Sequence, residues 1–193
     1  MSAVIQRGFV AAPPVFSVTA IYIAMSAAPL PYAVREKDAI AARWRAAAER
    51  NPALYDGPGL LFSDVVAAGG RLTATAHRTG FSTLLDLVAV DDAEGRAKNL
   101  FGAAAVIGSD GVCLLGRMSD ATAFPGTVKF PGGTPDDLDV RSDGSVDILG
   151  SIIRELAEET GLDAAAGTID PNLVVVTDGP LVAVHALVRF PEP

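Results

Sequence analysis

Three glutamates, Glu155, Glu158 and Glu159, stand in a short acidic run of the chain. At about 100° per residue, positions i, i+3 and i+4 share one face of a helix. Like charges four residues apart destabilise a helix, and Arg154, four residues before Glu158, offsets part of this cost. A hard divalent cation such as Mg²⁺ would offset more, because it binds carboxylate and phosphate oxygens. The simpler interpretation is a solvated acidic face.

The helix that would carry these carboxylates also has an apolar face. Gly161 follows its last turn, where a left-handed cap favours glycine. Asp147 or Ser145 is expected to cap its first turn. Residues at three- and four-residue steps form the apolar stripe, namely Ile148, Leu149, Ile152, Ile153 and Leu156. One face can therefore be buried while another concentrates negative charge.

A second motif, Phe130-Pro131-Gly132-Gly133, precedes the acidic run. The segment 130–133, followed by residues 154–162 (Arg-Glu-Leu-Ala-Glu-Glu-Thr-Gly-Leu), resembles the Nudix box of the Nudix hydrolases. The C-terminal half of this box matches the family pattern at every fixed position. The resemblance implies an α/β (α+β) fold, a Nudix-like α/β/α sandwich with a mixed sheet.

The resemblance also implies an activity, that of a Nudix-type pyrophosphohydrolase. The expected substrate is a nucleoside diphosphate linked to another moiety, and the expected cofactor is Mg²⁺ (or Mn²⁺). Glu155 or Glu159 is expected to take the proton from the attacking water. The implied metal ligands and catalytic residues are Glu155, Glu158 and Glu159, with Arg154 orienting them, and the implied substrate-binding residues are Gly132 and Gly133.

The N-terminal half of the box departs from the family in its spacing. The family places its arginine fourteen positions after the box glycine and an early glutamate six positions after it, whereas Arg154 follows Gly133 by twenty-one positions. Counting forward from Gly133 assigns the early acid to Asp139, and counting back from Arg154 assigns it to Val146. The polar stretch Thr134 to Ser145 is expected to form an extended loop.

Two basic residues precede or adjoin the glycines. Phe101 to Ile107 and Val112 to Arg117 are expected to form a hairpin across residues 109–111. Arg117, at the end of the second strand, is a candidate for binding a substrate phosphate, and Lys129 is another. A solvated side chain at a strand end is the alternative for each.

Residues 1–98 are expected to form an N-terminal α+β region, and residues 99–193 the catalytic domain. A charged connection at Asp91 to Lys98 marks this boundary. The elements expected before it are a helix over Asp38 to Arg50, strands over Leu60 to Ala67 and Arg71 to His77 joined at Gly69-Gly70, and a short helix or irregular segment over Phe81 to Leu87.

The N-terminal region carries a second resemblance. Ile40 and Trp44 on a helix, followed by residues 51–57 (Asn-Pro-Ala-Leu-Tyr-Asp-Gly), resemble the UDP-sugar diphosphatase branch of Nudix proteins. That branch implies UDP-glucose or UDP-galactose as substrate, with UMP and a sugar 1-phosphate as products. The alternative is a helix end followed by a turn, since Asn, Pro, Asp and Gly are turn residues.

Composition limits the partners and the compartment. The chain has 193 residues and a formal net charge of −8, which argues against nonspecific binding to nucleic acid or to an anionic membrane. The single Cys113 allows no internal disulfide and fits a reducing, cytoplasmic setting.

Residues 8–34 contain no charged residue, but prolines leave too short an apolar run for a membrane span. We expect Val15 to Met25 to form a buried strand. The alternative is a signal peptide, with Arg7 before the apolar core and a cleavage site at residues 26–28.

After the acidic helix, Leu173 to Thr177 and Val182 to Phe190 are expected to be strands. His185 and His77 are expected to be structural, with His185 a satisfied core histidine. The resemblance implies a further C-terminal helix, so the domain is expected to be C-terminally incomplete unless the branch is compact or a partner chain completes it. An edge left open in this way would favour a homodimer.

Two other classes of function stay open. One is a catalytically weak Nudix-fold module that binds a nucleotide or serves as a scaffold, which the altered early acid suggests. The other is a structural or interaction protein whose acidic helix only solubilises its surface. Hydrolysis, ligand-induced stabilisation and the response to divalent cations distinguish the three.

Overall fold

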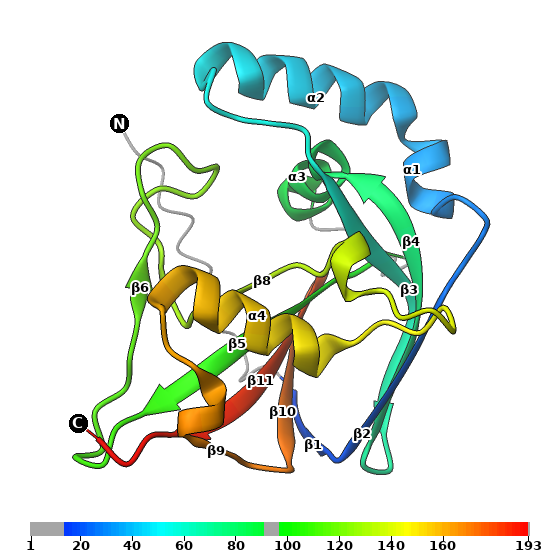
Figure 1. The fold of residues 1–193 in the computed structure, drawn as a ribbon. Coiled ribbons are helices and arrows are strands. Elements are labelled where there is room, and N and C mark those ends of the chain that lie inside the picture. The colour runs from blue at the N-terminus through cyan, green and yellow to red at the C-terminus, as the bar shows by residue number, and fades with distance from the viewer. Residues whose placement is uncertain (1–13, 91–96, 193) are drawn as a thin grey trace.

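The structure is a computed structural model and describes residues 14–90 and 97–192. Its described part is a mixed α+β fold, as predicted, with two principal sheets and α-helices packed around them (Figure 1). Most of the connection predicted over Asp91 to Lys98 lies outside the described residues. No helix in the described part of the chain is long and apolar enough to cross a membrane.

The larger sheet is mixed and has the strand order β1-β10-β11-β5-β8, with β9 also paired to β11. β11 and β5 run parallel, and the other pairs are antiparallel. The strands are β1 (Val15–Val18), β5 (Asn99–Ile107), β8 (Gly132–Gly133), β9 (Thr168–Ile169), β10 (Leu173–Asp178) and β11 (Leu181–Arg189). The two predicted C-terminal strands are thus confirmed as β10 and β11.

The smaller sheet, of order β2-β4-β3, is formed by the N-terminal half of the chain. Gly69 and Gly70 join β3 to β4 with φ angles of 57° and 75°, so the predicted hairpin is confirmed. A separate pair joins β6 to β7. The strands are β2 (Ala20–Met25), β3 (Pro58–Ala68), β4 (Arg71–Gly80), β6 (Gly116–Arg117) and β7 (Val128–Lys129).

The described helices divide between the two sheets. Helices α1 to α3 gather beside the N-terminal sheet, and α4 lies across the larger sheet (Figure 1). Their bounds are α1 (Pro31–Arg35), α2 (Lys37–Arg50), α3 (Phe81–Val90) and α4 (Ile148–Thr160), with 3₁₀ turns η1 (Asp137–Asp139) and η2 (Ala164–Ala166). The helices predicted at α2 and α4 are confirmed, and the helical alternative holds for α3.

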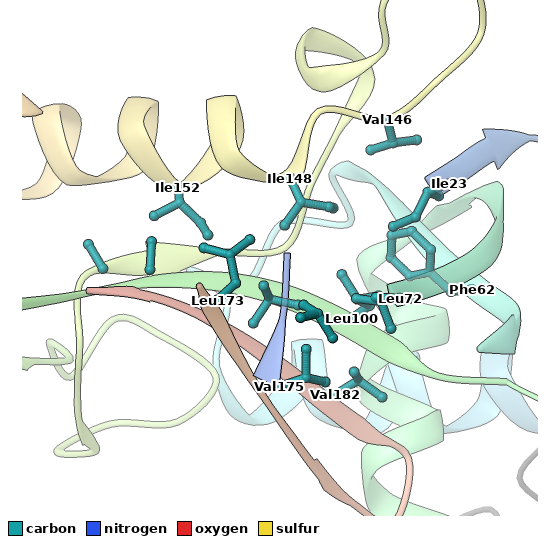
Figure 2. Close-up of a cluster of buried hydrophobic side chains, with 14 of the residues drawn as sticks. Ile23, Phe62, Leu72, Leu100, Val146, Ile148, Ile152, Leu173, Val175 and Val182 are labelled. Carbon is teal, nitrogen blue, oxygen red and sulfur yellow. The ribbon is translucent and has the colours of Figure 1, made fainter. Parts of the chain in front are cut away.

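One hydrophobic core connects both halves of the chain. Ile148 and Ile152 of α4 point onto the larger sheet, while Val146 lies beside Ile23 and Phe62 of the N-terminal sheet (Figure 2). A second, smaller cluster lies under α1 to α3 and consists of Leu30, Tyr32, Ile40, Leu61, Leu84, Leu87 and Ala97. Burial of the shared core therefore holds α4 and the N-terminal sheet together.

Two strand predictions differ from the structure, and the first, a single buried strand over Val15 to Met25, is wrong because Val15 and Tyr22 are exposed and the segment is divided. Residues 15–25 form β1 and β2 in different sheets, because the chain bends at Thr19, whose N–H donates to Gly70 O at 2.9 Å. β1 thereby enters the sheet of the C-terminal strands, and the division after residue 98 stays a prediction. The predicted hairpin holds only next to its turn, where Cys113 forms a β-bridge with Ile107 and Leu114 N donates to Val106 O at 3.1 Å. The end of the predicted second strand, Gly116–Arg117, forms β6 and pairs with β7 rather than β5.

The two histidines differ in how well their nitrogens are satisfied. His77 is buried, and its ring nitrogens lie 3.0 Å from Ser63 Oγ and 3.0 Å from Ala28 O, which confirms a structural role. His185 packs edge-on against Phe130, but its buried Nδ1 has no hydrogen-bond partner among the described residues. The prediction of a satisfied core histidine is therefore wrong for His185.

We expect His185 to make folding stability depend on pH. Burial lowers the pKa of His185 below its ordinary value of 6.5, so the folded state favours the neutral ring. The resulting stability is present above the unfolded-state pKa and is lost as pH falls through the folded-state pKa. Urea unfolding between about pH 5 and 8 should show wild type losing stability relative to His185→Leu on acidification. A constant difference, or a wild type that gains stability relative to His185→Leu on acidification, would contradict this.

Candidate active site

Local sequence determines both ends of α4. The side chain of Asp147 accepts a hydrogen bond from Gly150 N at 2.9 Å, which caps the first turn as predicted. Gly161 ends the helix in the left-handed conformation, with φ of 76°. Because Ile152 and Leu156 are buried on one face, the acidic residues lie on a face that meets the glycine motif.

Arg154 is the centre of a network of carboxylates. Its guanidinium lies 3.0 Å from Asp139, 3.0 Å from Glu155 and 3.1 Å from Glu158, each measured from nitrogen to oxygen. The Asp139 side chain is only 3% exposed. Its hydrogen bonds are the largest cause that raises the pKa of Arg154. Arg154 therefore orients two of the predicted metal ligands.

A backbone hydrogen bond closes the polar segment between the glycine motif and α4. Asp147 N donates to Asp139 O at 2.8 Å, so the residues on either side of the insertion lie next to each other. The intervening residues, Val140–Val146, form a detour whose ends pair with each other. Asp139 contacts Arg154, whereas Val146 belongs to the apolar core. Of the two candidates, Asp139 is thus the one whose side chain contacts Arg154, and its assignment as the early acid stays a prediction.

Glu159 contacts the glycine motif. Gly132 N donates to Glu159 Oε2 at 2.8 Å, and Lys129 Nζ lies 3.5 Å from Glu159 Oε1. Lys129 also donates to Gly132 O. Gly132 is buried against β5, so the hydrogen bond from Gly132 N to Glu159 ties α4 to the edge of the larger sheet. The structure thus brings Gly132 and Glu159 together.

Glu155 is the least exposed of the three glutamates, at 18% of its side chain. It packs on Gly133, where a Cβ atom would lie 2.9 Å from Glu155 Cδ. Burial is the main cause that raises the pKa of Glu155, and the negative charges of Glu158 and Glu159 add to it. Arg154 opposes this shift only in part. A carboxylate crowded in this way suits a site that receives a cation or a proton.

A cavity of about 620 Å³ opens beside Glu159. Arg117 and Lys129 supply positive charge to its wall, Glu159 supplies negative charge, and most of the other lining residues are apolar. Phosphate oxygens could contact the cations while a nucleoside base packs on the apolar part. The lining residues are Leu114, Leu115, Gly116, Arg117, Met118, Ser119, Thr122, Lys129, Phe130, Pro131, Glu159, Thr160 and Leu162.

The chemistry of the glutamates fits a hard divalent cation, although their side chains are engaged elsewhere in the structure. Across residues 14–90 and 97–192, no three His, Cys, Asp or Glu side chains converge as a metal site. Glu155 and Glu158 contact Arg154, and Glu159 contacts Gly132. The donors are nevertheless carboxylate oxygens, and mutual repulsion contributes to the raised pKa of Glu155. A bound cation would relieve that repulsion.

The predicted site residues are thus only partly brought together. The glutamates, Arg154 and the two glycines are in contact, whereas Arg117 reaches the site through the cavity wall. Sequence reasoning missed the apolar wall, including Leu114, Leu115 and Met118, because no periodicity marks residues of an irregular loop. The chain matches no protein-family model and no curated protein.

Proposed function

We propose that this protein is a metal-dependent hydrolase that cleaves the diphosphate linkage of a nucleoside diphosphate joined to another moiety, with UDP-sugars as the first candidates. One observation carries the proposal. Glu155 and Glu159 extend from one face of α4 onto Gly133 and Gly132, beside a cavity that holds Lys129. We also propose a cytoplasmic location, because the single cysteine is unpaired and exposed.

Each charged residue of the site has its own role in the proposed reaction. Glu155, Glu158 and Glu159 would hold Mg²⁺ or Mn²⁺, which when bound neutralises phosphate charge and lowers the pKa of its water. Glu155 is the better candidate for general base, because its raised pKa brings it closer to neutral pH. Arg154 keeps Glu155 and Glu158 in place, and Lys129 offers its charge to a phosphate oxygen.

We expect Asp139→Asn to lower activity about 10–100-fold, the usual effect of losing a partner that orients metal ligands. Asparagine keeps the shape of Asp139 but loses the charge that holds Arg154. The half-saturating Mg²⁺ concentration should rise as well, which a purely structural defect would not cause. The matched control is Asp137→Asn. Asp137 is exposed on the same turn, and its one ion pair within the described residues is with Arg78. Equal Mg²⁺ dependence in Asp139→Asn and wild type would contradict this role.

The substrate is identified by its products. UDP-sugars, ADP-ribose, dinucleoside polyphosphates and nucleoside triphosphates would each be incubated with the protein, with and without Mg²⁺. We expect UMP and a sugar 1-phosphate from a UDP-sugar, and no turnover without the metal. Absence of Mg²⁺-dependent cleavage of every diphosphate tested would refute the hydrolase proposal.

A second candidate is a nucleotide-binding module with little or no catalysis. The engagement of all three glutamates with Arg154 or Gly132 favours it, since those contacts compete with metal binding. Such a module would be stabilised by a nucleotide sugar without hydrolysing it. Thermal unfolding and product analysis on the same sample separate the two functions. Homodimer formation, which either function allows, is measured by sedimentation.

A further inference from the structure

A second cavity, of about 320 Å³, lies on the other side of the glycine motif. The first cavity is lined by Pro131 and Glu159, and this one by Gly133 and Glu155, so β8 and one turn of α4 separate them. Its other walls come from the N-terminal half of the chain. The lining residues are Gly57, Pro58, Gly59, Leu60, Leu61, Thr79, Gly80, Phe81, Leu84, Gly133, Thr134 and Glu155.

The wall chemistry of this cavity suits an uncharged ligand that carries hydroxyl groups. Glu155 is the one charged residue in its lining, so no lysine or arginine side chain lines this cavity to bind a phosphate. Thr79 offers a hydroxyl and Phe81 an apolar surface, while the Thr134 hydroxyl donates to Asn99 Oδ1 at 3.1 Å and keeps its capacity to accept. A volume of 320 Å³ is at the small end of ligand sites, about 300–1,000 Å³, and is enough for a monosaccharide-sized group.

Hydrogen bonds and a ring contact hold the N-terminal wall in shape. Asp56 Oδ1 accepts from Ser82 N at 2.7 Å, and Phe81 N donates to Gly57 O at 2.9 Å. Phe81 also packs edge-on against Trp44, with ring centroids 6.3 Å apart. The sequence alone allowed two interpretations of residues 51–57, a turn or a segment related to the substrate. In the structure this segment ends at the second cavity.

The same wall is held to the loop that precedes the acidic helix. Leu60 N donates to Pro135 O at 3.0 Å, next to the glycine motif. The inserted detour pairs with β2, where Met25 N donates to Gly144 O at 2.9 Å and Val146 N to Ile23 O at 3.0 Å. Backbone hydrogen bonds thus join the sheet that carries this wall to the segments that precede α4.

We propose that the second cavity binds the uncharged, hydroxyl-bearing group attached to the distal phosphate of the substrate, and that the N-terminal region thereby selects nucleoside diphosphate sugars. This inference rests on the proposed function. Glu155 and Glu159 are four residues apart, about 6 Å along the helix axis. A diphosphate beside these two residues directs its nucleoside into the first cavity and its sugar into the second.

Gly59 offers a direct test, because it lines the second cavity and a Cβ atom at this position would meet nothing within 4 Å. We expect Gly59→Leu to lower kcat/KM for UDP-glucose at least tenfold, chiefly through KM, while the stabilisation by UMP stays at the wild-type value. Gly116→Leu, in the first cavity, should weaken UMP and UDP-glucose alike. Ala68→Leu, at the exposed end of the same strand, is the control for folding.

The outcomes separate the cavity from the proposed hydrolase activity. Wild-type kcat/KM and binding of UDP-glucose in a folded Gly59→Leu variant would overturn the cavity assignment and leave the hydrolase proposal standing. If wild type binds UDP-glucose without cleaving it, and Gly59→Leu weakens that binding, the hydrolase proposal fails and the cavity assignment holds. If UDP-glucose stabilises wild type no more than UMP does, the cavity assignment is overturned.

Discussion

Replacing Glu159 by glutamine is expected to reduce Mg²⁺-dependent diphosphate hydrolysis by roughly 10²- to 10⁴-fold, the range that a metal-bound or proton-accepting carboxylate contributes. Glutamine keeps the size of the side chain and an oxygen that can accept from Gly132 N. The fold should therefore persist, and the loss should appear in kcat. Initial rates at saturating substrate across a Mg²⁺ titration measure the effect.

The control for this substitution is Glu49→Gln, on the exposed face of α2, which removes an equal charge far along the sequence from the acidic helix. It should leave the rate within a factor of two of wild type, since isolated surface changes have small effects, roughly 0.5 kcal/mol or less on stability. A Glu159→Gln enzyme with wild-type kcat and Mg²⁺ dependence would remove Glu159 from the site.

Gly132→Ala is expected to cost about 2–5 kcal/mol of folding stability, the sum of backbone strain and overpacking. Gly132 has φ of 151°, and a Cβ atom there would overlap the carbonyl oxygen of Gly102 and lie 2.6 Å from Ala103 Cα. Because both neighbours are backbone atoms of β5, no rotamer change relieves the overlap. Urea unfolding monitored by circular dichroism measures the loss.

Gly59→Ala is the matched control for this loss of stability. Gly59 also lies in a strand, its Cβ position is open, and the substitution should be neutral or stabilising by about 0.4–1 kcal/mol through the unfolded state. If Gly132→Ala were as stable as Gly59→Ala, the close approach of β8 to β5 would be wrong.

Elements controlled by neighbouring residues were predictable from the sequence. The apolar stripe, the Asp147 cap and Gly161 all act within one helix, and α4 has the expected ends. Strand partners were less predictable, because a strand satisfies its hydrogen bonds with any available edge. Thus β1 and β2 are consecutive in sequence but pair with β10 and β4, and β6 pairs with β7.

In the candidate site, too, only the features that neighbouring residues determine were predictable. The helical spacing of the glutamates placed them on one face, but counting residues could not choose between Asp139 and Val146. That choice depends on where the inserted residues leave and rejoin the chain, which the Asp139–Asp147 backbone hydrogen bond reveals. The second cavity had no local signal, because its walls come from three distant segments, residues 57–61, 79–84 and 133–134, together with Glu155.

The central proposal is that the carboxylates of α4 hold a divalent cation, and direct measurement of Mn²⁺ binding by electron paramagnetic resonance tests it without need of a substrate. We predict saturable Mn²⁺ binding by the wild-type protein and its loss in the variant that carries Glu155→Gln, Glu158→Gln and Glu159→Gln together. Equal Mn²⁺ binding by the folded triple variant and wild type, or no binding by wild type, would contradict the proposal.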